Sequence, residues 1–168
     1  MRTGKDIGII TAGLLVASML LFGCPVWLHG DKWTISLVHH FFHANIFHLA
    51  VNCYSFYLLC KSRNVTPSML LLAYACATLS WFCSNADPVG ASNIIFALLG
   101  LYTPALTHSW WRAPGTAVFF LTNMAMAFLP RVSAVTHLVS FGLGCVCAMG
   151  IRMYNSLLDD FRRATYHR

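Results

Sequence analysis

Long apolar runs, separated only by short polar connections, occupy almost all of this 168-residue chain. A helix needs about 20 apolar residues to cross the ~30 Å hydrocarbon core of a bilayer. Six crossings would use about 120 residues and leave enough chain for the connections. Charged residues make up only 10% of the sequence, well below the quarter or so that is usual in soluble domains. An ordinary water-soluble globule is therefore excluded.

We expect one all-α membrane domain, residues 1–168, built from six transmembrane helices. The predicted spans are 7–28, 46–60, 67–83, 91–106, 114–130 and 132–154. No internal repeat or long polar linker divides the sequence. The first run also resembles a lipoprotein signal that ends at Cys24, but the bulky Phe22 fits that pattern poorly, and we expect the run to be kept as a span.

The basic residues are divided unequally between the two sides of the predicted membrane. With a cytoplasmic N-terminus, nine of the eleven Lys and Arg residues fall in cytoplasmic segments, and only Lys32 and Arg131 fall in outer ones. This bias predicts that both termini are cytoplasmic. Topology thus explains the net charge of +6, and because the basic residues form no continuous stripe, we expect no nucleic-acid partner.

Four polar side chains are expected at one depth near the outer face. The second, fourth and sixth spans run from outside to inside, so their first turns lie at the same level. His48 and Asn52 share one face of the second span, Ser92 opens the fourth, and His137 lies about one turn into the sixth. A helix cap, a packed histidine or a hydrogen-bonded pair could explain each alone. Because polar groups in lipid are costly, we interpret the four as one site.

This set of side chains suits acyl transfer. A histidine can take the proton of a serine hydroxyl and return it to a leaving amine. Histidine, asparagine and the backbone N–H of Ser92 could stabilise the oxyanion. All five acidic residues are Asp, so the chain cannot form an HExxH zinc-protease motif, and none of them is near His137 in the sequence. We therefore expect a Ser–His dyad that needs no cofactor and no metal.

Small residues and the first loop favour a structured site. Gly90 permits an abrupt start to the fourth span, and a stripe of small residues would let the sixth span approach its neighbours closely: Ser140, Gly144 and Ala148. The loop 30–45 mixes aromatic residues with histidines. It suits either a layer at the outer interface or a structured loop that shapes a water-accessible cavity.

A metal or haem protein is a different hypothesis, with His39, His43, His48 and His137 as ligands. The seven cysteines form no CxxC motif and mostly fall inside the expected spans, so we interpret them as packing residues. A transporter or channel is disfavoured because no charged residue lies in the middle of a predicted span.

Three motifs together resemble the rhomboid family of intramembrane serine proteases. They are His43-x4-His48-x3-Asn52 on the second span, Gly90-Ala91-Ser92 continued by Ala97-Leu98-Leu99-Gly100 on the fourth, and His137 with Gly144 on the sixth. The resemblance implies a six-helix bundle whose serine lies in a water-filled cavity open to the outer side. The substrates it implies are membrane-anchored proteins whose transmembrane helix enters laterally from the bilayer and unwinds near its outer end.

The resemblance also implies a role for each matched residue. Ser92 would be the nucleophile, His137 the base, and His48 and Asn52 the oxyanion donors, while Phe96 occupies the place of an aromatic residue packed on the base. The apolar fifth span would act as a gate. The short chain resembles compact prokaryotic members, so we expect the bacterial inner membrane, with the active site facing outward.

Three positions depart from the family pattern. Asn93 follows the serine where glycine is usual, Ser140 replaces a glycine three residues after the base, and Trp33 is followed by Thr34 rather than by arginine. The alternative to a protease is therefore a weak or inactive rhomboid-like protein that binds transmembrane helices.

Overall fold

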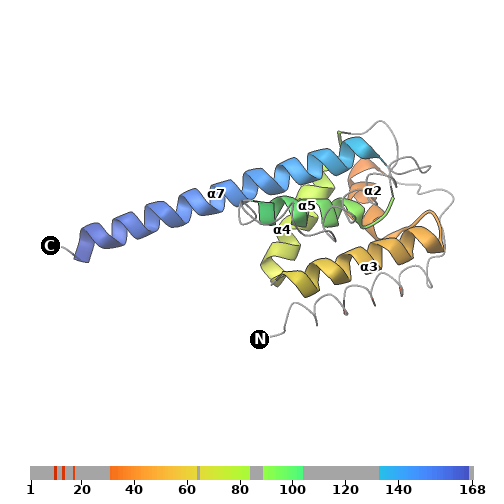
Figure 1. Cartoon of the computed structure of the whole chain (residues 1–168). Coiled ribbons are helices and arrows are strands. Elements are labelled where there is room, and N and C mark those ends of the chain that lie inside the picture. Colours follow the sequence, from red (N-terminus) through yellow and green to blue (C-terminus); the bar gives the residue numbers. More distant parts are fainter. Residues whose placement is uncertain are drawn as a thin grey trace.

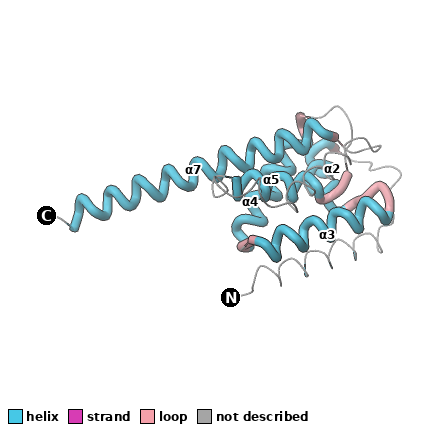
Figure 2. The backbone as a smooth tube through the Cα atoms, in the orientation of Figure 1, coloured by secondary structure: helices cyan, strands magenta, loops and turns pink. Residues whose placement is uncertain are grey.

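The structure is a computed structural model that describes residues 31–63, 65–83, 89–103 and 133–166, together with the isolated positions 10, 13 and 17. Helices and turns make up these ranges, which contain no strand (Figure 2). The all-helical prediction is thus confirmed for the described ranges. The predicted spans 7–28 and 114–130 lie outside them, apart from the three isolated positions. The number of spans and the side on which each terminus lies stay predictions.

Three helices run in the same direction from one end of the molecule. The described elements are α2 (Lys32–Val38), the 3-10 helix η1 (His39–Phe41), α3 (Ile46–Ser62), α4 (Pro67–Trp81), α5 (Ser92–Tyr102) and α7 (Ala134–Tyr166). The first turns of α3, α5 and α7 lie at the end of the molecule occupied by α2 (Figure 1). The common level expected for the beginnings of the second, fourth and sixth spans is therefore present in the fold.

Local sequence determines where the helices begin. The side chain of Asn45 accepts a hydrogen bond from the backbone N–H of His48 at 2.8 Å and caps α3. Thr66 caps α4 in the same way, and Pro67, which has no N–H to satisfy, occupies the first turn. Asp31 caps α2 through two backbone N–H groups, each 3.0 Å from its carboxylate. The predicted starts of the second and third spans agree with these caps.

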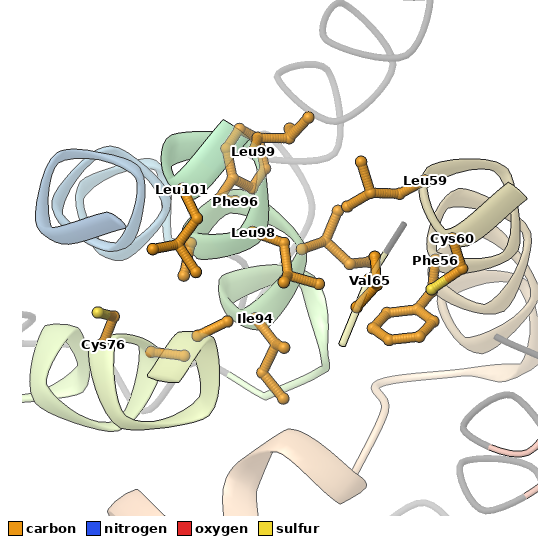
Figure 3. Close-up of a cluster of buried hydrophobic side chains, with 14 of the residues drawn as sticks. Phe56, Leu59, Cys60, Val65, Cys76, Ile94, Phe96, Leu98, Leu99 and Leu101 are labelled. Atoms are coloured by element: carbon orange, nitrogen blue, oxygen red, sulfur yellow. The ribbon is translucent and has the colours of Figure 1, made fainter. Parts of the chain in front are cut away.

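Helix α5 forms the centre of the described bundle. Its residues 92–101 are all buried. Its apolar side chains, including Ile94 and Leu98, lie between Phe56 of α3 and Cys76 of α4 (Figure 3). In a membrane such contacts hold helices together by close packing rather than by exclusion of water.

The close approach of α5 and α7 depends on glycine. A Cβ on Gly144 would overlap the carbonyl oxygen of Ala97, and a Cβ on Gly100 would overlap that of Phe141. Ser140 and Ala148, the other two members of the small-residue stripe, are also buried. The stripe therefore faces the inside of the bundle, as its spacing predicts.

One helical segment in the described part of the chain, Ala134–Arg163, is long and apolar enough to cross a bilayer. Pro67–Trp81 and Ser92–Tyr102 are apolar but shorter. Helix α7 continues beyond the predicted end of its span at residue 154 and extends past the other helices (Figure 1). No Pro or Gly occurs between residues 155 and 166 to end it.

Candidate active site

The serine and the histidine on α5 and α7 are hydrogen-bonded to each other. Ser92 Oγ lies 2.8 Å from His137 Nε2, and both side chains are buried. Ser92 is the first residue of α5, whose N-cap is Ala91 and has no side-chain capping bond. The hydroxyl therefore does not cap the helix. Its partner is the imidazole, which is the arrangement that a nucleophile and its base require.

An aromatic ring fixes the plane of the histidine. Phe96 lies one turn beyond Ser92, and its ring stacks on that of His137 with a centroid distance of 4.5 Å and an interplanar angle of 14°. The imidazole is thus held from one face by Phe96 and at Nε2 by Ser92. Both contacts come from the same face of α5, because these residues are spaced i,i+4.

Two side-chain donors from α3 converge beside Gly90. His48 Nε2 and Asn52 Nδ2 are buried and have no hydrogen-bond partner among the described residues. A Cβ placed on Gly90 would lie 2.8 Å from His48 Nε2 and 3.2 Å from Asn52 Nδ2. Gly90 has a φ of 116°, a conformation that favours glycine. Because glycine has no β-carbon, this space stays open. Two free N–H groups aimed at one space next to the serine could bind a developing oxyanion.

A backbone hydrogen bond indicates which nitrogen of His48 carries the proton. The N–H of Ala44 donates to His48 Nδ1 at 3.4 Å, so Nδ1 acts as an acceptor. In the neutral ring the proton then resides on Nε2, the nitrogen that points toward Gly90. His48 is therefore a hydrogen-bond donor at this position without being charged.

The first loop holds the segment that precedes the serine. The N–H of Gly90 donates to the carbonyl oxygen of His39 at 3.0 Å, and the N–H of Ala91 donates to His43 Nε2 at 3.4 Å. His43 belongs to a sequence motif and to the metal hypothesis, but neither of them predicts this contact with the segment before the serine. His39 holds Gly90 through its backbone carbonyl, and because every residue has this group, no residue type in the sequence indicates the contact.

The first loop is itself an ordered part of the bundle. His39, His40 and His43 are buried, and the loop is fastened to α4 by two hydrogen bonds, from Tyr74 Oη to the carbonyl of Leu37 and between His40 Nε2 and Thr78 Oγ1 at 3.3 Å. Of the two interpretations of the loop 30–45, these contacts favour the structured loop over a layer lying at the interface.

Burial keeps these loop histidines neutral. It lowers the pKa of His39 to about 4, against the opposing effect of hydrogen bonds to the carbonyls of Ser36 and Ile35. Burial lowers the pKa of His43 to about 3, with a smaller contribution from the electrostatic effect of the neighbouring His48 ring. The pKa of His40 is also lowered, mainly by burial.

Two of the three positions that depart from the family pattern, Asn93 and Ser140, are buried close to the site. Ser140 Oγ donates to Ser80 Oγ at 2.7 Å, and Ser80 belongs to α4, so the hydroxyl adds a bond between α7 and α4. Asn93 is 2% exposed, and its amide oxygen has no partner among the described residues. Neither side chain stands between Ser92 Oγ and His137 Nε2, which remain in contact.

The metal hypothesis requires at least three ligands around one point. Among the residues that the structure describes, no group of three His, Cys, Asp or Glu side chains is placed to hold a metal ion. The six described cysteines form no disulfide among the described residues: Cys53, Cys60, Cys76, Cys83, Cys145 and Cys147. Cys76 and Cys147 contact each other with their sulfurs 3.8 Å apart. Cys24 lies outside the described residues. The geometry favours the packing role for the described cysteines.

The chain that carries this Ser–His pair and these two N–H donors also matches a known protein family. A family model described as "Rhomboid domain" matches residues 29–154. The chain belongs to the rhomboid family. The rhomboid match extends from the first loop into α7 and includes all four predicted site residues. As a rhomboid, the protein is an integral membrane protein of a family that acts on transmembrane substrates in the bilayer. No curated protein and no solved structure gives a match.

Proposed function

We propose that this rhomboid is an intramembrane serine endopeptidase that cleaves transmembrane segments of membrane-anchored proteins near the outer face. The observation that carries the proposal is the buried 2.8 Å hydrogen bond between Ser92 Oγ and His137 Nε2. A serine that served only for packing would not need a histidine partner whose ring is stacked on an aromatic neighbour.

In the proposed reaction Ser92 Oγ attacks the carbonyl carbon of the scissile peptide bond while its proton moves to His137 Nε2. The negative charge on the carbonyl oxygen is stabilised by the N–H groups of His48 and Asn52 and by the backbone N–H of Ser92. The tetrahedral intermediate breaks down when His137 returns the proton to the leaving amine. Water then hydrolyses the acyl-enzyme by the same proton transfers.

A non-catalytic rhomboid that binds transmembrane helices is the second candidate. It is favoured by Asn93 and Ser140, which put larger polar side chains where the family usually has glycine. The two candidates differ in whether the serine reacts, and they share the same fold and the same membrane environment.

Labelling with a fluorophosphonate probe separates the two candidates, because the probe forms a covalent bond only with an activated serine. We expect labelling of the full-length protein in detergent or liposomes, and none of Ser92→Ala. Absence of labelling in folded wild-type protein, together with failure to cleave any model transmembrane substrate, would favour the binding protein.

We also propose that the protein has six spans, with both termini in the cytoplasm and the site open to the outer side of a bacterial inner membrane. The positive-inside bias of the sequence supports this orientation. Reporter fusions at the two termini and within residues 30–45 test it. Equal accessibility of both termini and of this loop from the cytoplasm would contradict it.

A further inference from the structure

Two buried polar atoms beside the Ser92–His137 pair have no hydrogen-bond partner among the described residues. One is Nδ1 of His137 and the other is the amide oxygen of Asn93. When His137 Nε2 accepts a hydrogen bond from the Ser92 hydroxyl, the neutral ring carries its own proton on Nδ1, so Nδ1 is a donor. The amide oxygen is an acceptor. Each atom is thus the chemical complement of the other, and a buried polar atom without a partner is costly.

The packing of α5 against α7 brings these two residues to the same level. A Cβ on Gly100 would lie 3.0 Å from the Cα of Gly144, so the two glycines lie opposite each other in a region where the helices approach closely. Asn93 lies seven residues before Gly100, and His137 lies seven residues before Gly144. The helices run in the same direction (Figure 1), and seven residues make about two turns of helix. Asn93 and His137 are therefore expected at one level, two turns before Gly100 and Gly144.

Neighbouring contacts support the same placement. Ser92 and Phe96, which lie on either side of Asn93 in the sequence, both touch the imidazole of His137. Asn93 is also enclosed in the bundle rather than turned to the outside, since only 2% of it is exposed. Asn93 therefore belongs to the turn of α5 that contacts the proposed base, and its side chain is enclosed within the bundle.

We propose that Asn93 is a positioning residue for His137. Its amide oxygen accepts a hydrogen bond from His137 Nδ1–H during catalysis, which holds the tautomer whose Nε2 can accept the serine proton. The same bond stabilises the imidazolium that forms when that proton arrives. This extends the proposed dyad to a Ser–His–Asn set and rests on the proposed function. The two groups are not hydrogen-bonded in this structure, and catalytic hydrogen bonds often tighten only when substrate is bound.

Substitution of Asn93 tests the proposal kinetically. Asn93→Ala and Asn93→Gly remove the acceptor, and Asn93→Asp keeps one. We expect kcat on a transmembrane substrate to fall about 10-fold to 100-fold in the Ala and Gly variants with little change in KM, because the bond strengthens in the transition state. Asn93→Asp should retain more activity than Asn93→Ala. A kcat in the Gly variant equal to or above that of the wild type would overturn the proposal.

Nitrogen-15 NMR of histidine-labelled protein tests the proposal without any need for cleavage. We expect His137 to carry its proton on Nδ1 in the wild type, and Asn93→Ala to shift the tautomer population toward Nε2–H. An unchanged His137 spectrum in a folded Asn93→Ala variant would overturn the proposal. If the protein cleaves substrate but the Asn93 variants match the wild type, only this inference fails. If it neither cleaves nor labels, the proposed function fails, and the tautomer still reports on Asn93.

Discussion

Gly144 on α7 lies against the carbonyl oxygen of Ala97 on α5, leaving no room for a β-carbon between the two helices. His137 lies about two turns before Gly144 on the same helix. The glycine contact therefore fixes how closely α7 approaches α5, and so whether the imidazole reaches Ser92. Packing in the middle of the bundle determines the geometry of the site at its end.

Gly144→Ala should separate α5 from α7 and lower both stability and activity. Because the added methyl group meets backbone rather than a flexible side chain, we expect a loss of about 1–3 kcal/mol or more in the free energy of unfolding. Gly142 on the same helix is the matched control, since a Cβ there meets nothing within 4 Å. Gly142→Ala should be neutral or slightly stabilising, because alanine favours helix. Unfolding in mixed detergent micelles measures both variants, and equal stability of the two would contradict the account.

Asn52→Ala should slow peptide cleavage without unfolding the protein. If Asn52 Nδ2 supplies one oxyanion hydrogen bond, its loss should lower kcat by about 10²–10³, as in other hydrolases. Binding of substrate should change little, because the interaction forms mainly in the transition state. Steady-state kinetics in liposomes measure this, and an unchanged kcat would remove Asn52 from the proposed site.

Gly90→Ala should impair the site sterically, because it removes no hydrogen-bonding side chain but fills the space beside the two donors. The methyl group would lie 2.7 Å from Cε1 of His48 and would occupy the space in front of both donors. Alanine is also strained at a φ of 116°. We expect cleavage to fall at least as far as in Asn52→Ala, with reduced fluorophosphonate labelling. Wild-type labelling of this variant would show that the space beside Gly90 is not needed.

Acid should destabilise the first loop. Burial lowers the pKa of His39 to about 4, whereas its ordinary value in an unfolded chain is 6.5. Between these values the unfolded chain binds more protons than the folded one, so stability is complete above about pH 6.5 and falls as the pH drops toward 4. His40 and His43 act in the same direction.

Thermal unfolding between pH 8 and pH 4.5 measures this effect. His39→Gln cannot titrate at this position, so it should weaken the dependence on pH, although His40 and His43 should keep part of it. A wild-type stability that stays constant down to pH 4.5 would contradict the burial of these neutral imidazoles.

Much of the fold could be predicted because the bilayer permits few arrangements. Asn45 and Thr66 are residue types that commonly cap helices, so the local sequence indicates where α3 and α4 begin. The alternating direction of successive spans led to the prediction that His48, Ser92 and His137 lie at one level. The hydrogen bond from Ser92 to His137 follows from that level and from the small residues that let α7 approach α5.

Other features depend on packing that no local pattern records. The N–H of Gly90 is held by the carbonyl of His39, and backbone groups carry no residue identity. The sequence after residue 154 contains no Pro or Gly that would mark the end of α7, so the length of this helix could not be predicted from it. The proposed pairing of Asn93 with His137 rests on the register of two helices at Gly100 and Gly144, and neither residue's own identity indicates it.

In the mechanism that we propose, Ser92 attacks a peptide bond inside the membrane and His137 acts as its base. Cleavage of a fluorescent transmembrane substrate in proteoliposomes tests it most directly, with wild type, Ser92→Ala and His137→Ala compared at equal amounts of folded protein. We expect cleavage near the outer end of the substrate helix by the wild type, and only background hydrolysis by either variant. Cleavage at the wild-type rate by either folded variant would contradict it.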